Sequence, residues 1–495
     1  MSLRLPRLLL LTAVAAAVLL PAEAARAQLK LRGTQDDTEL TVKGEVAPQP
    51  PPIKLKKPPR VTRIRSQPPP ALRTIDDLPT QDPAAARPAV DTGAPDPAAP
   101  LPAPKLDTDP PSLRRKPKPS LVEEDPYAAL GIDLGSFLLK PSIEVDFGYD
   151  DNPGRQPGKV KGSPFSTVTP KLEFASTWSR SELRGSITGG LSRYFEVDDN
   201  RPTLNALLDG RFDVSRDTSL DAEGRFVLDT ERLGSDGVSA SATKRPVTLA
   251  YGGTLGVTQA FGDASLRLRG SVDRNEYQMT PGATVSRNFN TYGLALRAGY
   301  EISPALKPFV ELDADERVHD DRLDSAGIRR DSHGLTGLAG LTFELDGALK
   351  GEVSAGYGER HYEDPSLDRL RGVITNASLV WTPSALTTVT LTGTSAFNES
   401  SITGASGSIS RQIGVDIAHS FRRNLIGTAA LRQTTTDYQG VSQTEHLWDA
   451  TLGLEYKFTR SVSVKASYAY EHLASTVPGA DYTANTVMLG LKLQR

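Results

Sequence analysis

Large apolar side chains occupy nearly every second position of this chain from residue 127 onward. Between Ile143 and Tyr149 the odd positions are apolar, whereas Glu144 and Asp146 stand between them. The last segment repeats the pattern up to Leu493. Because successive side chains of a β-strand point to opposite faces of a sheet, this alternation predicts strands with one apolar and one polar face.

The alternating segments define the expected strand number. We count about 18 of them, within a range of 16–18. Their predicted starts are Ser142, Thr167, Glu182, Thr203, Ser219, Val247, Ser265, Phe289, Phe309, Leu335, Gly351, Gly372, Thr388, Ile409, Gly427, Leu447, Val462 and Thr483.

The connections between these segments alternate in length. Longer polar stretches follow the odd-numbered strands, at Asp150–Pro164, Glu231–Pro246, Asp320–Ser332 and Ala474–Asp481. Tight joints follow the even-numbered strands, at Ser179-Arg180, Arg216-Asp217, Gly262-Asp263, Asp346-Gly347, Arg423-Asn424 and Thr459-Arg460. Short periplasmic turns, longer external loops and an even strand number are typical of barrels in a bacterial outer membrane.

Aromatic residues recur at one level of the even-numbered strands, just before the tight joints. Each has the parity of its strand's apolar face, and only the strand that ends near Val214 lacks one. The seven residues are Trp178, Phe261, Tyr300, Phe343, Trp381, Phe421 and Phe458. Rings at a common level indicate a membrane-interface girdle. Ordinary enrichment of aromatics at strand ends is the alternative.

The physics of a lipid environment favours closure of the sheet. Every backbone N–H and C=O group in hydrocarbon must pair internally, and a sheet achieves this only when it is closed. Strands of roughly 9–11 residues suffice to cross a membrane when tilted. The sequence therefore predicts an all-β fold, a closed antiparallel transmembrane β-barrel. A barrel of this size leaves an aqueous channel unless something plugs it.

The first 27 residues have the features of a cleaved secretory signal peptide. Arg4 and Arg7 precede an apolar run at Leu8–Leu20, and Ala25-Arg26-Ala27 provides a small-x-small cleavage pattern. The run is shorter than the roughly 20 residues that a membrane-spanning helix needs. The chain has no cysteine, which excludes disulfides and a lipid anchor on a cysteine after the signal.

Residues 28–126 differ in composition from the predicted barrel at 127–495. They hold 22 of the 37 prolines and none of the 31 aromatic residues, so they cannot bury enough apolar area to fold. We expect a disordered, Pro/Ala-rich periplasmic arm. Its tract Ile53–Arg65 contains six cations and no acid. The tract is either a solvated spacer or a contact with an anionic polymer such as peptidoglycan.

The start and the end of the predicted barrel resemble a known family. The residues concerned are GIDLGSFLLKPSIEVDFGYDDNP at 131–153, TPKLEFASTWSRSELRG at 169–185, Tyr194, and NTVMLGLKLQR at 485–495. They are similar to the outer-membrane β-barrel porin 2 family of Proteobacteria, over roughly residues 127–495. The resemblance implies an outer-membrane barrel and carries no catalytic residues. Many outer-membrane barrels end in Phe, whereas this chain ends in Gln494-Arg495.

Candidate catalytic and metal-binding patterns are weak. The six histidines show no metal-ligand spacing, and neighbours such as His361 with Asp364 or His472 with Glu471 are expected by chance in polar loops. The acidic clusters at 150–152, 198–200 and 320–321 could hold a hard cation, but turn chemistry explains them as well. We expect no enzyme activity, cofactor or resident metal.

Charged residues of both signs follow the polar face of the predicted strands. The expected lumen-facing set is Arg184, Asp209, Arg211, Asp213, Glu223, Arg225, Arg267, Arg269, Asp273, Glu311, Asp313, Asp315, Arg317, Glu352, Lys465 and Lys492. Mixed signs would polarise a water-filled pore without strong ion selectivity, or would fill the interior with salt bridges.

Two functions are compatible with these features. The first is a porin-like channel for passive diffusion of small hydrophilic solutes. The second is a non-conducting structural or surface-interaction barrel with external loops and a cell-wall-binding arm. Expected partners are outer-membrane lipid, lipopolysaccharide, the barrel-assembly machinery and, through the basic arm, peptidoglycan. The near-balanced net charge of -3 gives no reason to expect nucleic acid.

Overall fold

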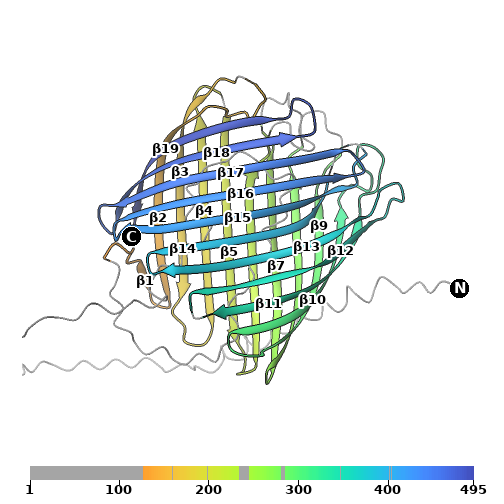
Figure 1. The fold of residues 1–495 in the computed structure, drawn as a ribbon, viewed down its shortest axis with the longest axis horizontal. Coiled ribbons are helices and arrows are strands. Elements are labelled where there is room, and N and C mark those ends of the chain that lie inside the picture. Colours follow the sequence, from red (N-terminus) through yellow and green to blue (C-terminus); the bar gives the residue numbers. More distant parts are fainter. Residues whose placement is uncertain are drawn as a thin grey trace, which may run out of the picture. The chain divides into compact units, whose positions relative to one another are not determined.

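The computed structural model describes residues 126–495, apart from 159, 198, 233–244, 280–284, 346, 401 and 403. The predicted signal peptide and periplasmic arm lie outside these residues. The described secondary structure consists of antiparallel strands (Figure 1). Among the described residues, no helix is long and apolar enough to span a membrane.

The strands are numbered along the chain. Their bounds are β1 Ile132–Leu134, β2 Phe137–Asp150, β3 Ser163–Ser176, β4 Glu182–Tyr194, β5 Asp199–Asp213, β6 Thr218–Thr230, β7 Val247–Phe261, β8 Ala264–Tyr277, β9 Phe289–Tyr300, β10 Leu306–His319, β11 Ser332–Leu345, β12 Leu349–Tyr362, β13 Leu370–Ser384, β14 Thr387–Asn398, β15 Gly407–Arg422, β16 Leu425–Gln439, β17 Gln443–Lys457, β18 Val462–Ser475 and β19 Tyr482–Gln494.

Strands β2 to β19 form a closed barrel of 18 strands, which confirms the predicted fold. Each strand pairs with the next, and β19 pairs with β2 from Thr486↔Asp150 to Gln494↔Ser142. In Figure 1 the blue strands of the C-terminal half cross in front of the yellow strands, so both walls of the barrel are visible. The short strand β1 was not predicted, and it pairs with the first residues of β2.

The two rims of the barrel differ as the connection lengths predicted. We call the rim with segments 177–181, 214–217, 262–263, 301–305, 346–348, 385–386, 423–424 and 458–461 the turn rim. We call the opposite rim the loop rim, with segments 151–162, 195–198, 231–246, 278–288, 320–331, 363–369, 399–406, 440–442 and 476–481. Segments 195–198 and 440–442 are short exceptions at the loop rim. The barrel begins and ends at the turn rim.

The outer surface of the barrel is apolar, and its inner surface is polar. On β9 the outward-facing Leu294 and Leu296 are exposed, whereas on β2 the inward-facing Glu144 and Asp146 are buried. A soluble protein buries its large apolar side chains, so an exposed band of this kind indicates a surface that faces lipid.

Aromatic side chains bound this apolar band near the turn rim. Six of the seven predicted girdle residues are exposed, and Phe343 is partly exposed. The strand that ends near Val214 also has an exposed ring, because Phe212 on β5 points outward. The prediction that this strand lacks an aromatic was therefore wrong. Phe212 has the same parity as Val214 and could have been recognised from the sequence.

A second row of exposed aromatics lies nearer the loop rim and was not predicted. On β7, Tyr251 stands ten residues from Phe261, and on β17, Trp448 stands ten residues from Phe458, just past the strand end. At a rise of about 3.3 Å per residue and a tilt of about 40°, ten residues span roughly 25 Å. This spacing equals the height of the apolar band in membrane barrels.

Candidate functional site: the barrel lumen

The predicted lumen-facing charges lie on the inner surface of the wall. All 16 are located on β4, β5, β6, β8, β10, β12, β18 and β19, at positions whose parity is opposite to the exposed apolar residues of the same strand. Alternation in a strand places these side chains in the lumen. The hydrogen bonds and ion pairs of these charged side chains fall into several groups.

Arg225 on β6 joins two strands across the lumen wall. Its Nη1 lies 2.5 Å from Glu223 Oε1, and its Nη2 lies 2.6 Å from Asp273 Oδ1 on β8. Thr254 Oγ1 on the intervening strand β7 accepts a further hydrogen bond at 3.3 Å. The guanidinium therefore neutralises two predicted lumen carboxylates at once, as charge-assisted hydrogen bonds favour.

Arg297 on β9 holds a second group of charges and was missed by the sequence reasoning. It forms an ion pair with Glu311 on β10, and its Nη1 lies 3.0 Å from Glu352 Oε1 on β12. Its guanidinium carbon lies 4.0 Å from the centre of the Phe309 ring. The inward positions before it on β9 carry no charge, so the sequence contained no row of charges to reveal it.

Strand β10 places three carboxylates in succession in the lumen. Glu311 pairs with Arg297, and Asp315 pairs with Arg360 on β12. Asp313 lies between them and makes no side-chain hydrogen bond or ion pair within the described part of the chain. The row of one sign is thus largely neutralised by cations from neighbouring strands, which argues against strong ion selectivity.

The remaining predicted charges form smaller groups. Lys465 on β18 lies 2.6 Å from Glu144 Oε2 on β2, and Lys492 on β19 faces the same part of the lumen. Nearer the turn rim, the more exposed pairs are Arg184 with Glu182 at 3.0 Å and Arg211 with Asp213 at 3.1 Å. Arg267 donates to Thr258 Oγ1, and Arg269 and Asp209 lie on the same inner surface.

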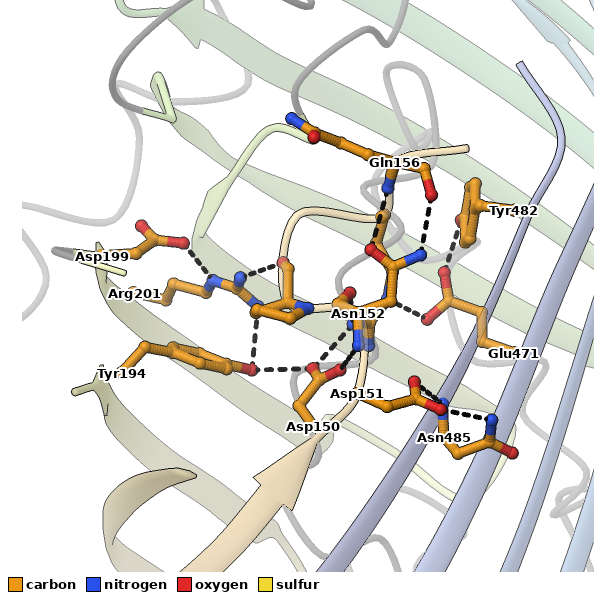
Figure 2. Close-up of polar contacts among 12 residues, drawn as sticks. Asp150, Asp151, Asn152, Gln156, Tyr194, Asp199, Arg201, Glu471, Tyr482 and Asn485 are labelled. Carbon is orange, nitrogen blue, oxygen red and sulfur yellow. Dashed lines mark hydrogen bonds and ion pairs between the residues drawn. The ribbon is translucent and has the colours of Figure 1, made fainter. Parts of the chain in front are cut away.

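A buried polar network lies in the lumen at the loop rim (Figure 2). Arg155, from the segment that follows β2, donates to Asp150 Oδ2 at 2.7 Å and to Glu471 Oε2 on β18 at 2.9 Å. The Arg155 side chain is only 1% exposed. Asp150 and Glu471 face the lumen, so Arg155 and its segment lie inside the barrel mouth. We call residues 151–158 the first inward segment.

Arg201 on β5 and Arg245 in the loop-rim segment 231–246 hold the first inward segment from its other side. Arg201 Nη2 donates to the carbonyl oxygen of Pro153 in this segment. Arg201 on β5 lies 2.8 Å from Asp199 Oδ2 and donates to Tyr194 Oη at 3.0 Å. Arg245 donates to the carbonyl oxygen of Pro153 at 2.8 Å, and Figure 2 shows Arg201 and Tyr194 grouped against the same segment. This arrangement satisfies polar groups of a backbone segment that lies inside the barrel mouth.

The charge on Arg155 is stable in this setting. Burial alone would lower the pKa of Arg155, but the nearby Glu471 and Asp150 carboxylates outweigh it and raise the pKa well above its ordinary value. Arg155 therefore stays charged throughout the range in which proteins fold. The network has one cation between two carboxylates, and each carboxylate has a further neutral partner, Tyr194 or Tyr482.

The structure brings together two histidines that the sequence had left apart. His333 and His361 lie directly opposite each other on β11 and β12, with ring centres 5.3 Å apart and planes within 4° of parallel. Both face outward. Within the described residues, no group of three or more His, Cys, Asp or Glu side chains is arranged to hold a metal ion.

The acidic clusters of the loop rim bind protein donors. Asp150 accepts the backbone N–H of Asn152, Asp151 accepts from Asn485, and Asp320 pairs with Arg274. These contacts agree with turn chemistry and ion pairing, the simpler of the two interpretations offered by the sequence.

Comparisons with known proteins agree with this architecture. A family model for putative beta-barrel porin 2 matches residues 125–495. No curated protein matches the chain.

Several solved structures are similar at low identity. OccK3 (OpdO) of Pseudomonas aeruginosa is 13% identical with a TM-score of 0.36, covering 72% of this chain and 96% of that one. OccAB4 of Acinetobacter baumannii is 10% identical with a TM-score of 0.38, covering 72% and 98%. The siderophore receptor PiuA of Acinetobacter baumannii is 9% identical with a TM-score of 0.40, covering 74% and 82%. At such low TM-scores these similarities carry no argument about function.

The family match covers most of the chain and coincides with the closed barrel and its polar lumen. The chain therefore belongs to the putative beta-barrel porin 2 family and is a channel-like β-barrel of the outer membrane.

Proposed function

We propose that the barrel is a channel for passive diffusion of small hydrophilic solutes. The observation that carries this proposal is the charged and polar inner wall of a closed 18-stranded barrel. A barrel of this size has room for an aqueous channel. The paired charges, such as Arg225 with Glu223 and Asp273, present polar groups to solutes of either sign and give neither sign an advantage.

The first inward segment narrows the barrel mouth and supports passage of small solutes rather than large ones. The buried ion pairs of Arg155 fix this segment in place, so it is an ordered part of the lumen lining. The non-conducting alternative, a structural or surface-interaction barrel, requires that inward segments close the lumen completely. Transport measurements separate the two functions.

Liposome swelling is the direct test of solute diffusion. Liposomes that contain the refolded full-length protein should swell in solutions of neutral sugars, fastest with monosaccharides and more slowly as the sugars lengthen. Heat-denatured protein is the control for leakage. Correct folding is checked separately by a heat-dependent shift on SDS gels. Folded protein that leaves the liposomes impermeable to every sugar would favour the structural alternative.

The orientation in the membrane follows from the rims. The carbonyl oxygen of Pro126 accepts from Arg460 Nε at 2.8 Å, so the described chain begins at the turn rim. Short turns face the periplasm in outer-membrane barrels. We therefore propose that residues 28–126 are periplasmic, where the basic tract at 53–65 would meet peptidoglycan. The apolar run and the small-x-small pattern of the first 27 residues support the further proposal that a signal peptide is cleaved near Ala27.

The outer surface at the loop rim supports contact with lipopolysaccharide. Above the second aromatic row the outward positions become polar and include Arg274 and Arg411, which pair with Asp320 and Asp437. Cations at this level suit the phosphates of lipopolysaccharide headgroups. Insertion by the barrel-assembly machinery is likewise proposed from the barrel architecture.

A further inference from the structure

The ends of β14 and β15 nearest the loop rim are separated from the end of β13. Phe397 has the parity of the outward-facing Leu391 on β14, and Ile409 has the parity of the outward-facing Ile413 on β15. Ile413 is 64% exposed, yet Phe397 and Ile409 are only 9% and 3% exposed. Something other than lipid therefore covers these two side chains.

The covering surface is the inner face of the neighbouring strands. Phe397 and Ile409 cluster with Leu338, Leu370 and Ile374, which have the inward parity of β11 and β13. A Cβ atom on the inward-facing Gly358 would lie 2.8 Å from Cε2 of Phe397, and one on Gly372 would lie 3.4 Å from Cδ1 of Ile409. Both side chains thus lie on the lumen side of β12 and β13.

The ladder of hydrogen-bonded strands shows the same departure. Strand β13 pairs with β12 as far as Leu370, but it pairs with β14 only as far as Asn376. Strands β14 and β15 remain paired with each other up to Asn398↔Ser408. The ends of β14 and β15 therefore lie on the lumen side of the end of β13, while β15 stays paired with β16 as far as Gly407↔Gln439. We call the described residues of the range 397–409, which are all but 401 and 403, the second inward segment.

Arg317 on the wall and Arg330 in the loop-rim segment 320–331 anchor this second inward segment. Arg317 on β10 lies 2.6 Å from Glu399 Oε1 and donates to the carbonyl oxygen of Phe397 at 2.8 Å. Arg330 donates to the carbonyl oxygen of Ala405 at 3.3 Å and is itself held by Asp324 at 2.7 Å. Ala405 is fully buried, so the connecting loop is part of the packed interior.

We propose that the second inward segment is the constriction of the pore and that the Arg317–Glu399 ion pair holds it against β10–β13. This inference rests on the proposed channel function and names the part of the lumen that sets its size limit. The solutes that it admits are small and hydrophilic, and it selects them by size rather than by charge.

The composition of the segment supports selection by size. Glu399 is the only charged residue between Phe397 and Ile409, and its carboxylate is engaged by Arg317. The described residues of the loop after it, Ser400, Ile402 and 404–406, are uncharged. A constriction without free charge excludes large solutes sterically and has little preference for cations or anions.

The anchor should persist in mild acid. Burial would raise the pKa of Glu399, but Arg317, His319 and Arg360 outweigh it and lower the pKa below its ordinary value. A lowered pKa keeps the carboxylate charged as pH falls, and the ion pair is lost only below the ordinary range of a glutamic acid, about pH 4.3. Tyr362 on β12 and Tyr277 on β8 are further titratable groups that face Glu399.

A shortened loop tests the constriction. In this variant Asn-Gly replaces residues 399–407 and joins the paired Asn398 and Ser408 by a two-residue turn. We expect a single-channel conductance in planar bilayers higher by roughly twofold or more, because the narrowest part has been cut back. Glu399→Gln keeps the loop but removes the ion pair, and it should increase switching between conductance levels. Glu316→Gln, on the outer face of β10, is the matched control and should behave as wild type.

The outcomes separate the constriction from the channel function. Folding of each variant is checked by heat-dependent gel mobility. Suppose that the wild type conducts and that neither the shortened-loop variant nor Glu399→Gln changes the conductance or the switching. This result would reject the second inward segment as the constriction but would leave the proposed channel function standing. A silent wild type with a conducting shortened variant would support the segment as a closure of the lumen. If the folded wild type and the folded shortened-loop variant are both silent, the proposed channel function is rejected, and the constriction is rejected with it.

Discussion

Replacing Arg155 by methionine should lower the free energy of unfolding of the barrel by roughly 3–5 kcal/mol. Arg155 lies between Asp150 and Glu471, at 2.7 and 2.9 Å, and all three side chains are at most 2% exposed. Without the guanidinium, two carboxylates remain close together in a buried site and lose the cation that pairs with both of them. Removing one partner from such a site lowers the free energy of unfolding by far more than the intact ion pair contributes to it.

Urea unfolding of the protein in lipid vesicles, followed by tryptophan fluorescence, measures this effect. The matched control is Lys161→Met, because Lys161 belongs to the same connection but pairs with Glu196 at the surface, with side chains 72% and 45% exposed. An exposed pair is worth about 0–1 kcal/mol, so the control should unfold almost as wild type does. Equal unfolding midpoints for the two variants would show that the network around Arg155 does not hold the first inward segment.

A charged residue on the outer surface should be nearly as costly. Leu452 on β17 faces outward between Trp448 and Phe458, at the middle of the apolar band. We expect Leu452→Arg to destabilise the barrel by roughly 2–4 kcal/mol, the cost of placing an arginine at the bilayer midplane. The reason is the loss of water from the guanidinium, which no nearby carboxylate on the apolar surface offsets.

The neighbouring position supplies the control. Thr451 has the opposite parity and faces the lumen, so Thr451→Arg places the same charge in water one residue away. Reversible unfolding in vesicles should show a large loss of stability for the outward variant and a small change for the inward one. Similar losses for both would mean that the two faces of β17 do not differ in environment, and the membrane assignment would fail.

The barrel could be predicted from the sequence because its determinants are local. Alternation fixes which face of each strand is apolar, and turn residues fix where strands end. Four of the 18 strands, β4, β7, β9 and β18, begin at the predicted residue. The largest error, five residues, is at β2, which begins at Phe137 and contains Pro141.

The structure explains why Pro141 is tolerated in β2. Proline lacks the N–H group that a strand ladder uses, and so it is confined to places where no partner needs that group. Along β2, the partner β1 ends opposite Leu139 and the partner β19 ends opposite Ser142. Pro141 lies in the gap between the two partners. This gap depends on the ends of distant strands and cannot be seen in the local sequence.

The lumen was only partly predictable for the same reason. Parity located charges on the inner face, but it gave neither their partners nor isolated cations such as Arg297. Loops have no periodicity, so the sequence held no signal that residues 151–158 and the described residues of 397–409 lie inside the barrel. The burial of Arg155 and of Phe397 depends on strands that are distant in the chain, and only the closed sheet brings them together.

The polar lumen of the barrel should conduct ions. Purified full-length protein, folded in detergent and added to a planar bilayer in KCl, tests this most directly. We predict discrete conductance steps and a reversal potential near zero in a salt gradient, because the lumen charges are paired in both signs. A bilayer that stays silent, although the same protein shows the heat-dependent mobility of a folded barrel, would contradict the account.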